Sequence, residues 1–230
     1  MSMVIDIHTH LALKEIYPIT YLNGMFGEGA SRMNKQGIDA ILSLFMTDNS
    51  CERLIRQMDM ANIQRAVLLI IDGGMGMQEP PFSLEDIYTI HFQILLRYPE
   101  RFLVFAGVDP RRGVAGLKLF EKSIIKFGFK GIKLYPPMGY SMDDRRLYDY
   151  YELCSANNLS VLIHTGPSLL QLRNEYAAAS NVYNISRQFP NVNFILAHAG
   201  LNPNALEEKI LSLPNVYLDI AGFQSIILTD

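Results

Sequence analysis

The sequence has few cysteines, no long basic run and no long apolar run. Cys51 and Cys154 stand far apart, and the absence of a C-x-x-C spacing argues against a disulfide framework or a thiolate zinc site. The net charge is −3, and without a cluster of Lys or Arg a nucleic-acid surface is not expected. No apolar run reaches the ~18 residues needed to span a bilayer. We therefore expect a cytoplasmic protein that acts on a small molecule, with no nucleic-acid or membrane partner.

The composition is that of a globular protein. Hydrophobic residues make up 49% of the 230 residues and charged residues 19%, which suits one compact domain with a large buried core. We expect a single domain over residues 1–230.

Strand-like apolar runs alternate with helix-like segments along the chain. The runs are rich in Val, Ile and Leu, which indicates a parallel sheet buried on both faces. They cover residues 4–7, 66–71, 102–108, 131–135, 160–163, 193–197 and 216–220. Helices are predicted over residues 51–62, 84–98, 114–127, 145–157, 168–189 and 204–213, with Ser50, Ser83 and Asp144 as N-caps of the first, second and fourth. Residues 11–49 show no sustained period, so we expect a long irregular insertion that shapes a pocket or lid.

The alternation predicts an α/β fold, a TIM-type (β/α) barrel. A complete barrel takes about 250 residues, or roughly 30 per unit, whereas only ten residues follow Ile220. We therefore expect a distorted barrel without its eighth βα unit. The edges of the first and seventh strands would then be exposed, which favours a partner chain, including a second copy, that covers them.

Two histidines end the first apolar run. His8 and His10 stand two residues apart, and in an extended chain this spacing puts both side chains on one face. Two neutral imidazoles there predict a metal site. The alternative is a pair of histidines that only hydrogen-bond at the rim.

Two further histidines end later runs. His164 closes the fifth run and His198 closes the sixth, at the rim where barrels of this kind keep their chemistry. Neutral imidazoles suit Zn²⁺, Mn²⁺ or Fe²⁺, and three protein ligands with one open position are typical of a catalytic site. His198 has two rival roles, as a fourth ligand or as a base beside the metal.

The motifs at these strand ends resemble the amidohydrolase superfamily, in particular the amidohydrolase-related branch with the aminocarboxymuconate semialdehyde decarboxylase-like enzymes. The resemblance runs from Met3 to about Phe223. It is carried by MVIDIHTH (3–10), GVDP (107–110), GFKGIKLYP (128–136), VLIHTG (161–166), AHAG (197–200) and YLD (217–219). It implies a distorted TIM barrel, a divalent metal, zinc first, and hydrolysis or non-oxidative decarboxylation.

The resemblance also implies roles for individual residues. His8, His10 and His164 match metal ligands, and His198 matches a catalytic acid/base or a group that orients water. The aspartate that this family places at the end of the eighth strand has no counterpart, because Asp230 lacks a preceding strand.

Three other residues near strand ends are candidates. Lys133 in the fourth run would meet a substrate carboxylate, or else pair with an Asp of a neighbouring strand. Arg111 would hold an anionic substrate, although loop arginines are usually only solvated. Asp219, at the end of the seventh run, would accept a hydrogen bond from a ligand histidine.

These residues favour a metal-dependent hydrolase in which metal-activated water attacks a small carbonyl, amide or lactone substrate with the help of His198. One alternative is a metal-dependent decarboxylase of a small unsaturated or aromatic carboxylic acid, in which His198 handles the proton at carbon. A second alternative is an inactive, truncated barrel. The ligand set is the same for all three, so the sequence leaves them open.

Overall fold

Strands and helices alternate along the chain, and the predicted apolar runs form the strands. The computed structural model describes residues 3–27, 35–200 and 208–222. The strands are β1 (Ile5–Thr9), β2 (Arg65–Leu69), β3 (Phe102–Val108), β4 (Gly131–Leu134), β5 (Ser160–Ile163), β6 (Asn193–Leu196) and β7 (Val216–Leu218). The helices are α1 (Ile19–Gly24), α2 (Lys35–Phe45), α3 (Glu52–Met60), α4 (Leu84–Arg97), α5 (Gly113–Phe127), α6 (Tyr148–Ala156), α7 (Val182–Gln188) and α8 (Glu208–Leu211).

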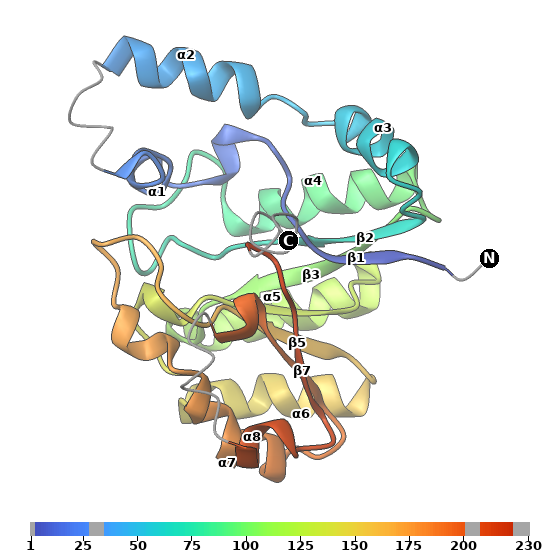
Figure 1. The fold of residues 1–230 in the computed structure, drawn as a ribbon, viewed down its shortest axis with the longest axis vertical. Coiled ribbons are helices and arrows are strands. Elements are labelled where there is room, and N and C mark those ends of the chain that lie inside the picture. Colours follow the sequence, from blue (N-terminus) through green and yellow to red (C-terminus); the bar gives the residue numbers. More distant parts are fainter. Residues whose placement is uncertain (1–2, 28–34, 201–207, 223–230) are drawn as a thin grey trace.

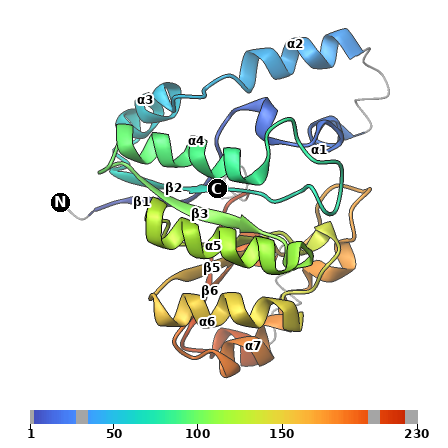
Figure 2. The same ribbon diagram turned by 180° about the vertical axis from the view of Figure 1, so that it is seen from behind.

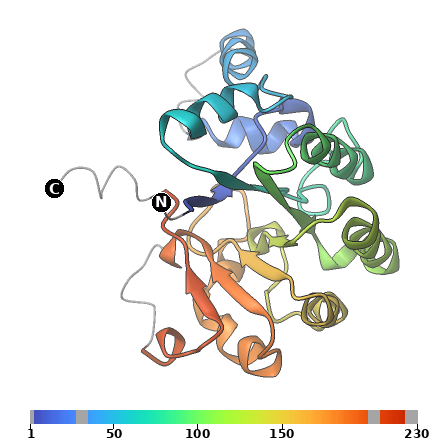
Figure 3. The ribbon, with the colours of Figure 1, turned by 90° about the vertical axis from the view of Figure 1, so that its right-hand side faces the viewer.

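The strands form one parallel sheet in the order of the sequence, β1 to β7. The sheet curls into an arc with helices on its outer side, so that β1 and β7 come to lie near each other (Figure 3). Helices α4, α5 and α6 lie side by side over this outer face (Figure 2). Among the described residues the barrel has seven strands and lacks the eighth, as the sequence predicts.

Two apolar layers hold the arc together. The large layer lies between the sheet and the helices and includes Leu68 and Ile132. The small layer includes Val67 and Leu162. Neighbouring positions of one strand fall into different layers because successive side chains of a strand point to opposite faces. Lys133 follows Ile132, so this rule places its side chain on the face opposite the helices.

The outer strands of the arc carry exposed apolar side chains. Within the described residues, each of these two strands pairs with one neighbour only, β1 with β2 and β7 with β6. Unpaired strand edges offer free backbone groups to another chain. The exposed side chains near them are Met3, Val4, Ile5, Tyr217, Leu218 and Ile220, between 37% and 60% exposed.

Most predicted helices are present, and their ends have clear physical causes. The Ser83 hydroxyl accepts a hydrogen bond from the backbone N–H of Asp86 and forms a capping box that begins α4. The prediction that Ser50 caps α3 is wrong: Asp48 accepts hydrogen bonds from the N–H groups of Arg53 and Leu54 at 3.0 and 2.9 Å. No helix in the described part of the chain has both the length and the hydrophobicity to cross a bilayer.

Two predicted segments, residues 168–189 and residues 11–49, differ from the structure. A continuous helix over residues 168–189 is wrong: a loop and two short 3₁₀ turns precede α7, which is seven residues long. The predicted helix over residues 204–213 is present as α8, and residues 204–207 lie outside the described residues. The insertion over residues 11–49, predicted to be irregular throughout, instead contains α1 and α2, which lie beyond the sheet on one side of the arc (Figure 1).

Candidate metal centre

Four histidines meet at the carboxyl ends of the strands. His8 lies in β1 and His10 just after it, His164 follows β5, and His198 lies in the short 3₁₀ helix after β6. The ring centroid of His8 lies 5.3 Å from that of His10 and 5.0 Å from that of His198. The His164 and His198 centroids are 4.8 Å apart. Three separate strands thus bring four imidazoles into one cluster.

The backbone is irregular at two of these histidines. The β1–β2 register shifts between Asp6 and Thr9, and the Asp6 carboxylate accepts a hydrogen bond from the N–H of His8 at 3.0 Å. His198 has a φ of +59°, a backbone conformation that residues with a Cβ rarely adopt. Irregular strands and strained residues of this kind concentrate at functional sites.

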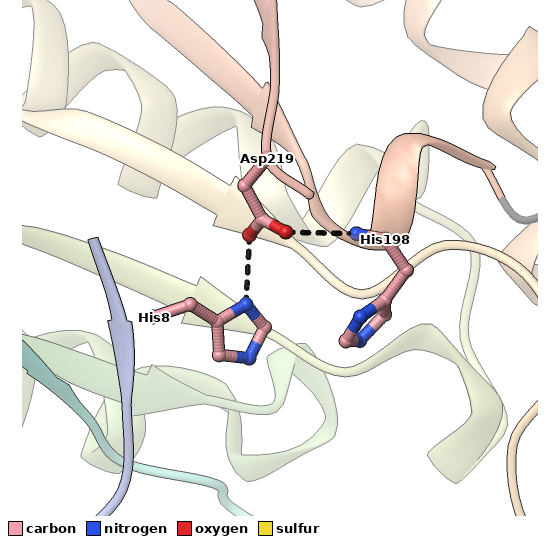
Figure 4. A group of neighbouring side chains, drawn as sticks. All are labelled: His8, His198 and Asp219. Atoms are coloured by element: carbon pink, nitrogen blue, oxygen red, sulfur yellow. Dashed lines mark hydrogen bonds and ion pairs between the residues drawn. The ribbon is translucent and has the colours of Figure 1, made fainter. Parts of the chain in front are cut away.

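Asp219 connects two of the histidines. Its Oδ2 lies 2.7 Å from Nδ1 of His8, and its Oδ1 accepts hydrogen bonds from the backbone N–H of His198 and Ala221 at 2.9 and 3.0 Å (Figure 4). Burial acts to raise the pKa of Asp219, but these hydrogen bonds outweigh it and the pKa is lowered. The carboxylate is therefore ionised, and both of its oxygens are engaged.

The hydrogen bonds assign the protons of the imidazoles. Nδ1 of His8 faces the Asp219 carboxylate, and Nδ1 of His10 lies 2.8 Å from the Leu69 carbonyl. Nδ1 of His198 lies 2.8 Å from the carbonyl of Ala221. Since these oxygens only accept hydrogen bonds, each Nδ1 must carry the proton, which leaves Nε2 with its lone pair in a neutral ring.

His164 completes this chain of hydrogen bonds. Its Nδ1 lies 3.2 Å from Nε2 of His198, which in the neutral ring can only accept. His164 therefore donates through Nδ1, and its Nε2 keeps a lone pair. That Nε2 is buried and has no hydrogen-bond partner among the described residues, as expected for an atom that binds an ion.

The same environment keeps the imidazoles neutral. Burial lowers the pKa of His8, and it lowers those of His10 and His164 well below the usual value, with Lys133 adding to the effect at all three. Metal binding needs the unprotonated ring nitrogen. The donor set of His8, His10 and His164 therefore fits a divalent metal ion, with each ring oriented through its other nitrogen, as is usual for metal-bound histidines.

The closest group of ligand atoms in the described residues differs from this set. It consists of His8, His198 and Asp219, whose ligand atoms all lie within 4.8 Å of one another. In this group the short contact is the hydrogen bond between His8 and Asp219, so the two atoms already satisfy each other. Among the four clustered histidines, the imidazole lone pairs that no hydrogen bond of the described residues uses belong to Nε2 of His8, His10 and His164.

Lys133 lies buried beside the cluster. Its side chain is 1% exposed, and Nζ has no hydrogen-bond partner among the described residues. Burial lowers its pKa to about 7, while the charge of Asp219 acts in the opposite direction. An amine in this state can pair with the carboxylate of a ligand.

Arg111 is held by other residues. Its guanidinium donates two hydrogen bonds to Asp109, at 2.9 and 2.6 Å, and one to the carbonyl of Met138 at 2.8 Å. Asp109 also accepts a hydrogen bond from the N–H of Arg111 and caps the turn that follows β3. Arg111 is thus part of a rigid rim, and its donors are largely used within the protein.

Tyr135 is a neighbour of the cluster that residue patterns did not single out. Its ring stacks on His164 with centroids 4.3 Å apart. Its hydroxyl lies 2.7 Å from the Ser168 hydroxyl and 3.3 Å from that of Tyr21. Its position gives the one signal available from sequence, since it directly follows β4 as His164 follows β5.

Comparisons with known proteins agree with this fold. Among curated proteins, none matches the chain. The solved structure of 5-carboxyvanillate decarboxylase from Novosphingobium aromaticivorans, with manganese and 4-hydroxy-3-methoxy-5-nitrobenzoic acid, is 18% identical. The match covers 86% of this chain and 65% of that enzyme, with a TM-score of 0.62.

Two further solved structures have the same fold. Dihydroxybenzoic acid decarboxylase from Polaromonas, with manganese and the inhibitor 2-nitroresorcinol, is 16% identical over 99% of this chain and 81% of that enzyme, with a TM-score of 0.62. 4-Oxalomesaconate hydratase from Rhodopseudomonas palustris is 20% identical over 95% of this chain and 74% of that enzyme, with a TM-score of 0.60. The chain thus spans from about two thirds to about four fifths of these enzymes.

The family assignment rests on a separate comparison. A family model described as amidohydrolase matches residues 5–226, a range that includes the four clustered histidines, Lys133 and Asp219. This match confirms the resemblance seen in the strand-end motifs, and the chain belongs to the amidohydrolase family.

Proposed function

We propose that this chain binds one divalent metal ion through Nε2 of His8, His10 and His164 and catalyses the non-oxidative decarboxylation of a small carboxylic acid. The observation that carries the choice of reaction is the state of Asp219. Both oxygens of this carboxylate are engaged by His8 and by two backbone N–H groups. With Asp219 engaged, hydrolysis would have to take the base for the attacking water from His198 alone, whereas decarboxylation needs no base and uses His198 only to deliver a proton.

Lys133 supports an acidic substrate. A buried amine without a partner among the described residues gains most from an anionic group, because a hydrogen-bonded charge pair offsets the cost of burial. A bound metal ion would supply Lewis-acid stabilisation of the substrate's oxygen atoms. We assign the substrate carboxylate to the side of the histidine cluster on which Lys133 lies.

His198 is the candidate proton donor. The bond between the substrate carbon and its carboxylate breaks, carbon dioxide leaves, and the electron pair left on carbon takes a proton. His198 lies next to His8 and His164, and once protonated at Nε2, in place of the hydrogen bond from His164, it would supply that proton. Two solved structures with this fold are decarboxylases with manganese, so Mn²⁺ is the first ion to test beside Zn²⁺.

Hydrolysis is the second candidate. It would use the same three ligands, and His198 would act as the base because Asp219 is engaged. Release of carbon dioxide from a panel of aromatic and unsaturated acids, set against hydrolysis of amides and lactones, separates the two reactions.

Metal content is the primary test. The purified chain is supplemented with Mn²⁺ or Zn²⁺ and measured by elemental mass spectrometry beside His8→Ala, His10→Ala and His164→Ala. The matched control is His91→Gln, which changes the fifth histidine, on α4. About one equivalent of metal in the parent and control, lost in the three variants, supports the site. No metal in the parent would refute the proposal and favour an inactive barrel.

A further inference from the structure

An apolar pocket opens beside His10. Its volume is about 160 Å³, and its walls come from the end of β1, from α1, from the segment after α2 and from the segment after β2. The residues that shape it are His10, Tyr17, Tyr21, Leu22, Met25 and Met46. It therefore lies between the long insertion after β1 and the histidine cluster.

The polar atoms of the pocket wall are bound elsewhere. The Tyr17 hydroxyl donates to the carbonyl of Leu11 at 3.0 Å, and the Tyr21 hydroxyl pairs with that of Tyr135. His10 uses Nδ1 for the carbonyl of Leu69. Asp, Glu, Lys and Arg are absent from the described residues of the lining. Among the described side chains that line the pocket, the polar atom that these hydrogen bonds leave free is thus Nε2 of His10, which belongs to the proposed metal site.

The size of the pocket limits what enters it. Pockets for whole small molecules measure about 300–1,000 Å³, so this one holds only part of a ligand. An apolar cavity of about 150 Å³ accepts a benzene ring. The occupant is therefore one uncharged ring or a branched hydrocarbon group of similar size.

We infer that this pocket receives the uncharged hydrocarbon end of the substrate, the size of one benzene ring, while the acidic end lies toward His10 and Lys133. The assignment to a substrate rests on the proposed function. The pocket's preference for an apolar group rests on its walls alone. A second charged group at that end of the substrate would be desolvated without a partner and is therefore excluded.

A series of ring contacts connects the wall of the pocket to the histidine cluster. The rings of Tyr17 and Tyr21 stack, with centroids 6.0 Å apart. Tyr21 contacts Tyr135, which stacks on His164. The pocket is therefore preformed on this side. Met25, which is 62% exposed, stands at the mouth, where a flexible thioether can adapt to ligands of different shape.

The test measures binding of benzene to the full chain without added metal. Methionine methyl groups are labelled with ¹³C, and the signals of Met25 and Met46 are assigned from Met25→Leu and Met46→Leu. We expect both signals to shift on addition of benzene. Ala12→Phe fills the pocket, which Ala12 also lines, and should weaken benzene binding at least about tenfold. Leu44→Phe, an exposed position on α2, is the control and should bind as the parent does.

A second measurement concerns the charge of the ligand. In Zn²⁺-loaded protein, benzoate should shift the same two signals, and terephthalate, which carries a second carboxylate, should not. If Ala12→Phe does not fold, Met46→Phe replaces it. Equal benzene binding by the parent and the filled variant would overturn the inference. Loss of metal binding with intact benzene binding would instead refute the proposed function, but the pocket's preference for an apolar group would stand.

Discussion

Nδ1 of His8 and Oδ2 of Asp219 lie 2.7 Å apart, and this hydrogen bond joins the first strand of the sheet to the end of the seventh. These two strands are the outer strands of the arc, and in the part of the chain that the structure describes each pairs with one neighbour only. Asp219 also holds the backbone of His198 after β6. One carboxylate therefore connects the ends of the barrel and orients His8, a histidine of the proposed metal site.

Asp219→Asn should weaken both the fold and the metal site. The amide loses the charge and cannot satisfy the same three donors, so we expect a loss of about 1–3 kcal/mol in the free energy of unfolding. Metal affinity should fall about 10–100-fold, because His8 loses the partner that fixes its ring. Urea unfolding and calorimetric metal titration measure the two effects. Glu100→Gln, which removes an exposed charge paired with Arg65, should change neither, and unchanged metal affinity in Asp219→Asn would contradict the prediction.

Tyr135 should act on metal affinity through its ring and on stability through its hydroxyl. Tyr135→Phe keeps the stack on His164 but leaves the hydroxyls of Ser168 and Tyr21 without their partner, at a cost of about 1 kcal/mol. Tyr135→Leu also removes the stack and should lower metal affinity about tenfold. Tyr98→Leu, at a ring that packs on Phe102, is the control for loss of an aromatic side chain. Equal metal affinities in the two Tyr135 variants would refute the role of the stack.

Lys133→Met should stabilise the metal-free protein and weaken binding of acids. The folded pKa of about 7 lies below the unfolded value of 10.5, so burial costs stability at pH 7 and the cost declines as the pH rises toward 10.5. We expect a gain of ~2–4 kcal/mol at pH 7 in urea unfolding and weaker benzoate binding in Mn²⁺-loaded protein. Lys130→Met, at an exposed position, should change stability by less than about 0.5 kcal/mol. A destabilised Lys133→Met variant would show that the amine has a structural partner.

His91 should make the protein sensitive to acid. Its side chain is fully buried on α4, and burial lowers its pKa to about 4 against the opposing hydrogen bond to Ile87. The unfolded chain, with a pKa of 6.5, takes up the proton first, so stability falls as the pH drops from 6.5 toward 4. His91→Leu should remove this loss, which amounts to about 2 kcal/mol at pH 5. The free energy of unfolding of the metal-free protein, measured at pH 7 and pH 5, tests this prediction. Parallel pH profiles of stability for parent and variant would contradict it.

Local patterns were sufficient for the strands but not for all helices. The apolar runs that form β3 and β5 are bounded by turn residues, and a parallel sheet buries such runs on both faces. The predicted helix over residues 168–189 failed because α7 occupies only its last part. The Ser168 hydroxyl and N–H are engaged by Tyr135 and Asn174, and these contacts favour a loop that the sequence pattern does not reveal.

The sequence by itself determined which chemistry is available at this rim. His8, His10, His164, His198 and Asp219 each stand at a strand end, and parallel strands place their carboxyl ends together. The motifs at these strand ends also identified the family, because each motif is a short continuous stretch of sequence.

Only the tertiary structure decided how these groups are used. Pairing of His8 with Asp219, burial of Lys133 without a partner among the described residues, the stack of Tyr135 on His164 and the pocket beside His10 each join segments distant in sequence. Proton positions and pKa values follow from such contacts, because they depend on which donors, acceptors and charges surround a group in space. The sequence pattern contains none of these distances, so the choice of His8 as the partner of Asp219 and the enclosure of a pocket beside His10 could be known only from the fold.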